Sequence, residues 1–226
     1  MENAAGLITW SLIATSVATL ALFAWLLRPA NVRRDTTPNK ARPAHVNPSL
    51  SVLPEQFIVF DLETTGLNAE RHEIIEIGAI KANRNSDLHQ TFQSFVIPNG
   101  RISARITELT GINRTMVQKD GLPLQQALEE FKEFVGDLPM IAYNAEFDEA
   151  FVRAACFRTS TEPMSNAIYC ALKMARRAWP NRKSYRLVDL ARDGGLAIDD
   201  AHRALGDCHR ALLIYVAAAK ELGSYR

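Results

Sequence analysis

The sequence predicts an α/β domain in which helices flank a mixed β-sheet, and one transmembrane helix before that domain. Two observations support the domain: strand-like segments come first, and helical periodicity fills the second half. Strands followed by helices are typical of a sheet with helices packed on it. A long uncharged segment near the N-terminus supports the transmembrane helix. The contents of apolar (47%) and charged (23%) residues are those of a globular protein.

Residues 4–27 are predicted to form the transmembrane helix. The sequence carries no charge from Asn3 to Leu27, and such a run is long enough to cross the hydrocarbon core of a bilayer as a helix. A cleaved signal peptide would instead have a basic N-terminal region and a shorter apolar core. Only the acidic Glu2 precedes this run, so we expect a retained single-pass anchor.

Residues 28–50 are predicted to form a basic, proline-rich linker. Its basic residues outnumber its single acid, Asp35. Because basic residues concentrate on the cytoplasmic side of membrane spans, we expect an inner (cytoplasmic) membrane protein whose C-terminal domain faces the cytoplasm. Three cysteines without C-x-x-C spacing agree with a reducing compartment and argue against a disulfide framework or a zinc site.

The domain predicted for residues 51–226 begins with a short buried strand. Phe57–Phe60 form a continuous apolar run, as in a strand that is buried on both faces. Two further strands are expected: Glu73–Ile80 is rich in β-branched residues, and His89–Ile97 alternates apolar with polar residues. The short connections between these segments favour antiparallel neighbours.

Helical periodicity dominates the rest of the chain, with one short strand in between. Apolar residues recur there at helical spacing, and Pro123 is a typical first residue of a helix. In order, we expect a helix at Pro123–Val135, a strand at Met140–Tyr143, and helices at Ala145–Phe157, Ile168–Ala178, Arg186–Arg192 and Ala204–Leu222.

Two acids, Asp61 and Glu63, follow the first predicted strand. Residues two apart in a strand point to the same side, so the two carboxylates are expected side by side. Such acids repel each other and are costly to desolvate, and a divalent cation would relieve both effects. A strand end with two solvated acids is the alternative for this D-x-E pattern taken alone.

Two later segments supply further candidates. Asp148 falls in the first turn of a predicted helix that follows a strand, where it could also be an ordinary acid favoured by the helix dipole. His202 and Asp207 lie five residues apart at the entry to the last helix, although a lone histidine there is more often a cap or surface residue. Oxygen ligands of this kind fit Mg²⁺ or Mn²⁺. Carboxylate-rich sites that hold two such ions are suited to phosphodiester hydrolysis.

Three segments together resemble the exonuclease motifs of DEDDh-type 3′→5′ exonucleases, the family of the epsilon proofreading subunit of DNA polymerase III and ribonuclease T. The segments are Phe60-Asp-Leu-Glu-Thr-Thr-Gly-Leu67, Asn144-Ala-Glu-Phe-Asp148 and His202-x-Ala-x-x-Asp207. The resemblance covers nearly all of the chain after Gln56. It implies a ribonuclease H-like fold and a two-metal-ion mechanism that uses two Mg²⁺ or Mn²⁺. It also implies a single-stranded nucleic acid as the substrate.

The resemblance also implies a role for each matched residue. Asp61 would bridge both ions, Glu63 and Asp207 would complete one site, and Asp148 would serve the second ion. His202 would accept the proton of the attacking water, a task that suits an imidazole near its ordinary pKa. The chain departs from the family pattern at Tyr143, where many relatives carry His, and at Cys170, where relatives often carry Asp. These departures affect substrate contacts more than the chemistry.

Substrate contacts are expected from the motifs and from a basic stretch. Between Glu162 and Asp189 the sequence has no acid, but it has six bases interleaved with Trp179 and Tyr185. Basic side chains can bind the phosphates of a single strand, and aromatic rings can stack on its nucleobases. A solvated helix face with a core tryptophan is the alternative. Leu67 is expected to wedge against the terminal base, by analogy with relatives. The candidate substrate-binding residues are Thr64, Thr65, Gly66, Leu67, Asn144, Phe147, Arg182, Lys183 and Tyr185.

The sequence therefore predicts a membrane-tethered, metal-dependent 3′→5′ exonuclease, with DNA favoured as its substrate. A 3′→5′ exoribonuclease of the same family is a competing hypothesis, because no residue identifiably reads a 2′-hydroxyl. Two hypotheses come from outside the enzyme class: a module that binds nucleic acid without cutting it, and a structural membrane protein. The sequence identifies no protein partner.

Overall fold

The computed structural model describes residues 53–86, 89–198 and 201–223, and these form a five-stranded sheet with helices on both faces. The strand order is β3-β2-β1-β4-β5. The strands are β1 (Gln56–Thr64), β2 (Ile74–Asn83), β3 (Gln90–Phe95), β4 (Met140–Ala142) and β5 (Ile168–Cys170). β1, β2 and β3 pair antiparallel, whereas β4 and β5 continue the sheet in parallel. The predicted mixed sheet is confirmed.

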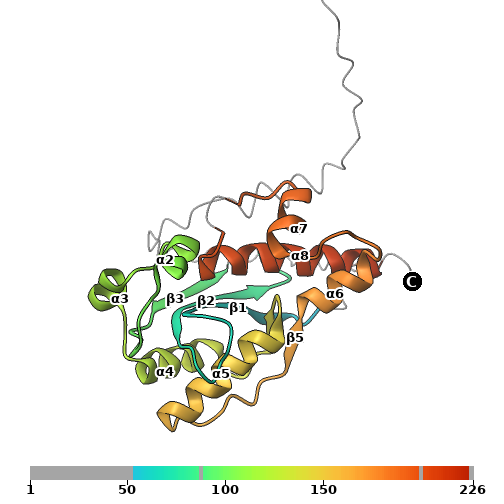
Figure 1. Cartoon of the computed structure of the whole chain (residues 1–226). Coiled ribbons are helices and arrows are strands. Elements are labelled where there is room, and N and C mark those ends of the chain that lie inside the picture. The colour runs from blue at the N-terminus through green and yellow to red at the C-terminus, as the bar shows by residue number, and fades with distance from the viewer. Residues whose placement is uncertain (1–52, 87–88, 199–200, 224–226) are drawn as a thin grey trace, which may run out of the picture. The chain divides into compact units, whose positions relative to one another are not determined.

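Among the described residues, seven helices follow β3, with β4 and β5 between them, and the five from α4 onward come in the order that the sequence predicts. They are α2 (Ala104–Thr110), α3 (Arg114–Asp120), α4 (Leu124–Val135), α5 (Ala145–Thr159), α6 (Ala171–Ala178), α7 (Leu187–Asp193) and α8 (Ala204–Gly223). Helices α4 and α5 lie on one side of the sheet and α8 lies on the other (Figure 1).

Strand β1 divides its side chains between these two helical layers. Ile58, Phe60 and Leu62 belong to one core cluster with residues of α4 and α5. Phe57 points to the opposite face, where its ring lies 6.0 Å from that of Tyr215 on α8. The apolar run 57–60 is almost fully buried, as a strand covered on both faces requires.

Two parts of the sequence-based assignment are wrong. The predicted helix Ile168–Ala178 begins only at Ala171, because its first three residues form β5, which pairs with β4. Helices α2 and α3 were not expected. Their N-caps, Ser103 and Asn113, accept hydrogen bonds from backbone N–H groups three residues later.

The predicted transmembrane helix 4–27 and the linker 28–50 lie outside the described residues. Among the helices that the structure describes, none has the length and apolar character needed to cross a membrane.

Candidate active site

The last part of β1 carries the first two candidate residues on the face that α8 covers. Asp61 is half-buried and Glu63 is buried. Both lie inside β1, which continues to Thr64, so the strand is longer than the apolar run alone predicts. Their side chains share one face because they are two residues apart in a strand.

The start of α8 brings His202 and Asp207 to the same place. His202 has a left-handed backbone conformation (φ 62°), and its backbone N–H donates a hydrogen bond to Oδ2 of Asp207 at 3.0 Å. Nε of Arg210, which is 4% exposed, donates to Oδ1 of Asp207 at 3.0 Å. Each carboxylate oxygen of Asp207 therefore has a fixed donor, which orients the group.

Asp148 reaches the site from the first turn of α5. Its carboxylate is buried, which raises its pKa, and hydrogen bonds from the backbone N–H groups of Asp148 itself and of Leu62 partly offset that rise. Its Oδ1 atom has no hydrogen-bond partner among the described residues. A buried carboxylate oxygen without a partner is costly, so it is a candidate ligand for a cation.

The five candidate catalytic residues meet in one region of the fold. One ligand atom from each of Glu63, His202 and Asp207 lies within 4.8 Å of the others. Asp61 and Asp148 line a cavity of about 320 Å³ together with His202 and Asp207. The structure thus brings together side chains from β1, α5 and the start of α8.

The carboxylates in this cluster resist ionisation. Burial raises the pKa of Glu63 to about 8, with further contributions from the charges of Asp207 and Glu76. Burial likewise raises the pKa of Asp148 to about 8. The pKa of Asp61 rises well above its ordinary value, first through burial and then through the charges of Asp148 and Asp207. Full ionisation near neutral pH therefore needs a positive counter-charge.

A divalent cation fits this set of donors. The donors are carboxylate oxygens and one imidazole, and the described residues of the cluster include no cysteine ligand. Hard cations such as Mg²⁺ and Mn²⁺ prefer oxygen ligands. The residues available to hold cations are Asp61, Glu63, Asp148 and Asp207.

Glu76 is a neighbour of the site that the sequence analysis missed. It is fully buried on β2, directly opposite Glu63 in the sheet register. Its carboxylate accepts hydrogen bonds from Gln93 and Arg203, each at 2.8 Å, and from the backbone N–H of Ala204 at 3.0 Å. The sequence could have pointed to Glu76, because it is an acid inside the β-branched run 73–80. A carboxylate buried in such a strand needs hydrogen-bond or charge partners.

The candidate substrate residues of the motifs take different positions. Asn144 and Phe147 line the cavity. Thr64 and Thr65 shape the turn after β1: the Thr64 hydroxyl donates to the carbonyl of Gly66 at 2.7 Å, and Oγ1 of Thr65 accepts from the backbone N–H of Glu73 at 3.0 Å. Leu67 is 86% exposed beside this turn, as a residue that contacts a ligand must be.

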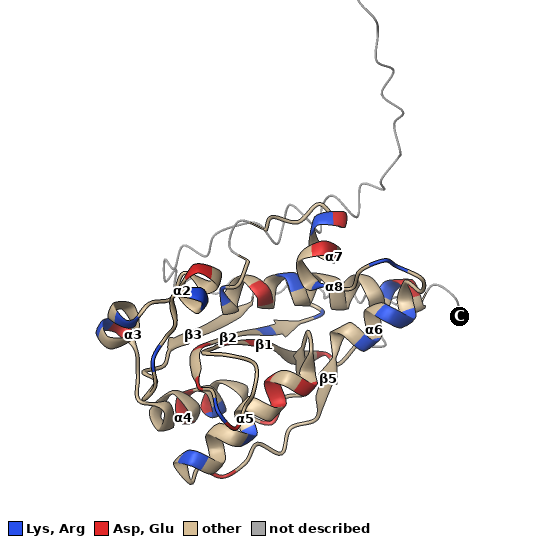
Figure 2. Ribbon diagram, in the orientation of Figure 1, with Lys and Arg blue, Asp and Glu red and all other residues tan. Residues whose placement is uncertain are grey.

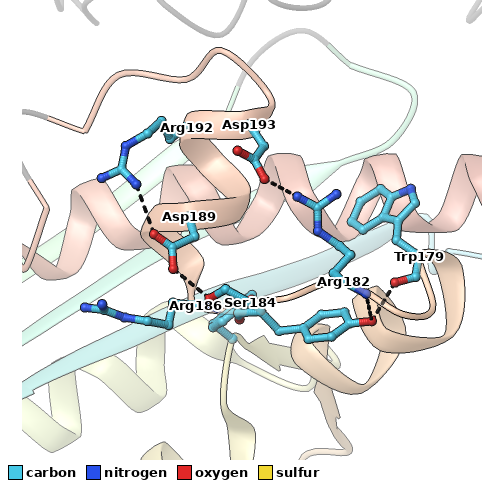
Figure 3. A network of polar contacts seen from close by, with 9 residues as sticks. Trp179, Arg182, Ser184, Arg186, Asp189, Arg192 and Asp193 are labelled. Atoms are coloured by element: carbon cyan, nitrogen blue, oxygen red, sulfur yellow. Dashed lines mark hydrogen bonds and ion pairs between the residues drawn. The ribbon is translucent and has the colours of Figure 1, made fainter.

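The three candidates of the basic stretch do not line the cavity. The Arg182 guanidinium forms an ion pair with Asp193, and the Tyr185 hydroxyl donates to the carbonyl of Trp179 at 2.6 Å (Figure 3). Lys183 is exposed. A substrate role for these three residues stays a prediction. The residues of this region that do line the cavity follow them directly: Arg186, Leu187 and Val188.

The Tyr143 hydroxyl, at the first position that departs from the family pattern, donates to the backbone carbonyl of Tyr185. Burial raises the pKa of Tyr143, so it stays a neutral donor. The side chain thus joins the end of β4 to the segment before α7.

The fold and this cluster define the class of protein: an α/β protein with a mixed sheet and a carboxylate-lined cavity suited to divalent cations. The model of a family described as exonuclease (RNase_T) matches residues 58–215. The chain therefore belongs to this exonuclease family, and the resemblance drawn from the three motifs is confirmed at the family level.

The similar proteins by sequence include DNA polymerases III of the PolC type. The chain is 35% identical over 170 residues to the protein of Caldanaerobacter subterraneus and 34% identical over 179 residues to that of Halalkalibacterium halodurans. These alignments cover 75% and 79% of this chain, but only 12% of either polymerase. The chain therefore corresponds to a small part of those relatives.

The similar solved structures include exonuclease I of E. coli. The complex with single-stranded DNA in its zinc-bound form has a TM-score of 0.64 at 18% identity, and covers 77% of this chain and 41% of that one. The complex with a dA16 oligonucleotide has a TM-score of 0.65 at 18% identity, covering 76% and 43%. At this identity the likeness concerns the fold alone.

Proposed function

We propose that this protein is a metal-dependent 3′→5′ exonuclease that removes nucleotides from single-stranded ends, with DNA as the favoured substrate. The observation that carries the proposal is the convergence of four carboxylates and one imidazole in a chain of the exonuclease family. Each motif alone has an ordinary structural explanation, but their meeting at one cavity does not.

Asp61, Glu63, Asp148 and Asp207 would hold two Mg²⁺ or Mn²⁺ ions. Bound there, such ions would lower the pKa of a water molecule and neutralise charge on the phosphate and the leaving oxygen. The fold holds these ligands in position. Arg210 and the His202 backbone orient Asp207, and Oδ1 of Asp148 has no hydrogen-bond partner among the described residues.

His202 would accept the proton of the attacking water at a ring nitrogen. The side chain lines the cavity, and its position at the entry to α8 is set by the left-handed backbone and by the bond to Asp207. A neutral imidazole is suited to this transfer near physiological pH.

The preference for DNA rests on the relatives. The similar proteins by sequence include DNA polymerases, and the similar solved structures include complexes of exonuclease I with dT13 and dA16 oligonucleotides. Within this chain, Asn144 and Phe147 would contact the terminal nucleotide, and the exposed Leu67 would wedge against its base.

Residues 4–27 would anchor the protein in the inner membrane, with the domain facing the cytoplasm. The support is the uncharged run and the basic residues that follow it. The described part of the domain contains all five candidate catalytic residues, so the anchor would set location and not chemistry.

The proposal is tested with the full-length chain purified in detergent. We expect a 5′-labelled single-stranded DNA to shorten stepwise from its 3′ end in Mg²⁺ or Mn²⁺, and no shortening in excess chelator. Matched RNA should be degraded more slowly. Tight strand binding without cleavage under any divalent ion would support the binding module instead, and faster RNA degradation would support the exoribonuclease.

A further inference from the structure

The cavity has an acidic side and a side that begins helix α7. Asp61, Asp148 and Asp207 form the first, and Arg186, Leu187 and Val188 form the second. Among the described residues that line the cavity, Arg186 alone carries a permanent positive charge. A nucleic-acid strand is a polyanion, so a fixed cation on the side opposite the acids favours its binding in this cavity.

The backbone is held by hydrogen bonds at Tyr185 and at Arg186. The Tyr143 hydroxyl donates to the carbonyl of Tyr185, and Oγ of Ser184 accepts from the Arg186 N–H at 3.3 Å. The Arg186 carbonyl accepts from the N–H groups of Asp189 and Leu190, each at 3.0 Å. This segment is therefore positioned before any ligand arrives, which lowers the entropic cost of binding.

The acids near Arg186 bind other partners. Asp189 accepts from the Ser184 hydroxyl at 2.6 Å and pairs with Arg192 at 3.0 Å, and Asp193 pairs with Arg182. The guanidinium of Arg186 is exposed and makes no hydrogen bond or ion pair with the described residues. Its charge acts on Asp189 only at longer range: the pKa of Asp189 is lowered first by the Ser184 hydroxyl, with Arg186 a lesser cause. Figure 3 shows this side chain extending away from the network.

From this geometry we propose that Arg186 is a substrate-binding residue that holds a phosphate of the strand near its 3′ end. The inference rests on the proposed exonuclease function and adds a residue to it. A guanidinium can donate two parallel hydrogen bonds to a phosphate. Leu187 and Val188, with Phe147 also lining the cavity, offer apolar surface to the sugar and base.

The inference changes the assignment of the basic stretch. Lys and Arg residues gather on α6 as well (Figure 2), and these include Lys173, Arg176 and Arg177. None of these three lines the cavity, and Lys173 pairs with Glu146 at 2.6 Å. They are suited to a weaker contact with the strand farther from the end, whereas Arg186 contacts one defined phosphate.

The test measures binding of a single-stranded DNA oligonucleotide to the full-length chain with Mn²⁺, in an Asp148→Asn background that blocks cleavage. We expect Arg186→Ala to weaken binding about 10-fold, a typical loss for one charge-assisted phosphate contact, and to reduce the salt slope by about 0.7. Arg186→Lys should recover part of the loss, because a lysine keeps the positive charge but cannot donate two parallel hydrogen bonds to a phosphate. Arg153→Ala, at an exposed arginine of α5 outside the cavity lining, is the matched control and should change binding less than 2-fold.

Neutral methylphosphonate linkages, placed singly at the three linkages nearest the 3′ end, identify the contact. At the contacted linkage, the neutral group should weaken binding to the Arg186 protein but not to Arg186→Ala. Equal losses in both proteins at all three linkages would overturn the inference. If the protein with Asp148 and Arg186 both unchanged cleaves DNA normally in that case, the exonuclease proposal stands. Absence of both cleavage and binding would overturn the two together.

Discussion

Gly78 on β2 lies in direct backbone contact with Ala204, the first residue of α8. A Cβ atom on Gly78 would lie 2.6 Å from the carbonyl carbon of Ala204 and 2.6 Å from the nitrogen of Leu205. Gly78 is also the register partner of Asp61, and its carbonyl accepts a hydrogen bond from the Cys208 thiol at 3.2 Å. The missing side chain thus lets the helix that carries Asp207 approach the strand that carries Asp61.

Gly78→Ala should therefore separate the two halves of the metal site. The added methyl group meets backbone atoms, which cannot rotate away, so we expect a loss of about 1–3 kcal/mol in the free energy of unfolding. We also expect a fall in nuclease activity of the protein that remains folded. Urea unfolding and single-turnover cleavage measure the two effects. Gly194→Ala is the control, since its Cβ would meet nothing closer than 3.3 Å. Unchanged activity in Gly78→Ala would contradict the close-approach argument.

Glu76→Gln should disturb the site without touching a candidate metal ligand. It keeps the size of the side chain but removes the charge that binds Arg203 and the Ala204 N–H. Hydrogen bonds to a charged group contribute about 1.5–3 kcal/mol each, so we expect a loss of that order in the free energy of unfolding. The turnover rate should fall more than substrate affinity, because His202 is next to Arg203. Glu129→Gln, at an exposed position of α4, is the control, and equal effects in both variants would refute this role.

The sequence predicts the central elements of this fold because their signals are local. The helical pattern 145–157 carries its own periodicity and was found close to its predicted bounds, and the apolar run 57–60 lies inside β1, although the strand extends from Gln56 to Thr64. β5 was missed because three residues are too few to show a hydrophobic pattern. Its strand character comes from pairing with β4. Helices α2 and α3 have seven residues each, which leaves room for about two turns of periodicity.

The same distinction explains which site residues the sequence could identify. Motif spacing pointed to Asp61, Asp148 and Asp207, since each lies at the end of a predicted strand or the start of a predicted helix. From the basic stretch, Arg182, Lys183 and Tyr185 were chosen as candidates and Arg186 was not, because composition does not reveal which charges are paired inside the protein. Only the contacts with Asp193 and Trp179 separate Arg182 and Tyr185 from Arg186, which lines the cavity.

Removal of residues 1–27 should release the protein from membranes and leave the cleavage rate within about 2-fold. All five candidate catalytic residues lie in the described ranges after residue 52, so the proposed anchor contributes none of them. Membrane fractionation with alkaline washing, followed by assay of both fractions, measures the two outcomes. Replacement of the uncharged segment by an unrelated transmembrane helix is the control and should restore membrane binding. A full-length protein that stays in the soluble fraction would contradict the proposed anchor.

Asp61→Asn should abolish cleavage without lowering the thermal stability of the metal-free protein. The pKa of Asp61 is raised by burial and by neighbouring carboxylates, so ionising this carboxyl group destabilises the metal-free fold. We expect the metal-free variant to unfold at the same or a higher temperature than the unmodified protein, while cleavage falls at least 10³-fold because a ligand of both proposed ions is lost. Asp137→Asn, at an exposed acid, should change neither property. Full cleavage activity in Asp61→Asn would overturn the proposed mechanism.

Divalent ions should stabilise the protein more at pH 8 than at pH 6. The pKa values of Glu63 and Asp148 rise to about 8 in the folded protein, whereas unfolded carboxyl groups titrate near 4. Between these values the folded state binds more protons than the unfolded state, so metal-free stability falls as the pH rises through this window. Cations compete with those protons for the same oxygens and bind better as the pH rises.

An ion present at 100 times its dissociation constant adds about 2.7 kcal/mol to the free energy of unfolding, or roughly 5–10 °C to the melting temperature. Melting curves with and without Mn²⁺ at both pH values test this, and the double variant Glu63→Gln/Asp148→Asn should flatten both dependences. An equal Mn²⁺ shift at pH 6 and pH 8 would show that these carboxylates are not the ligands.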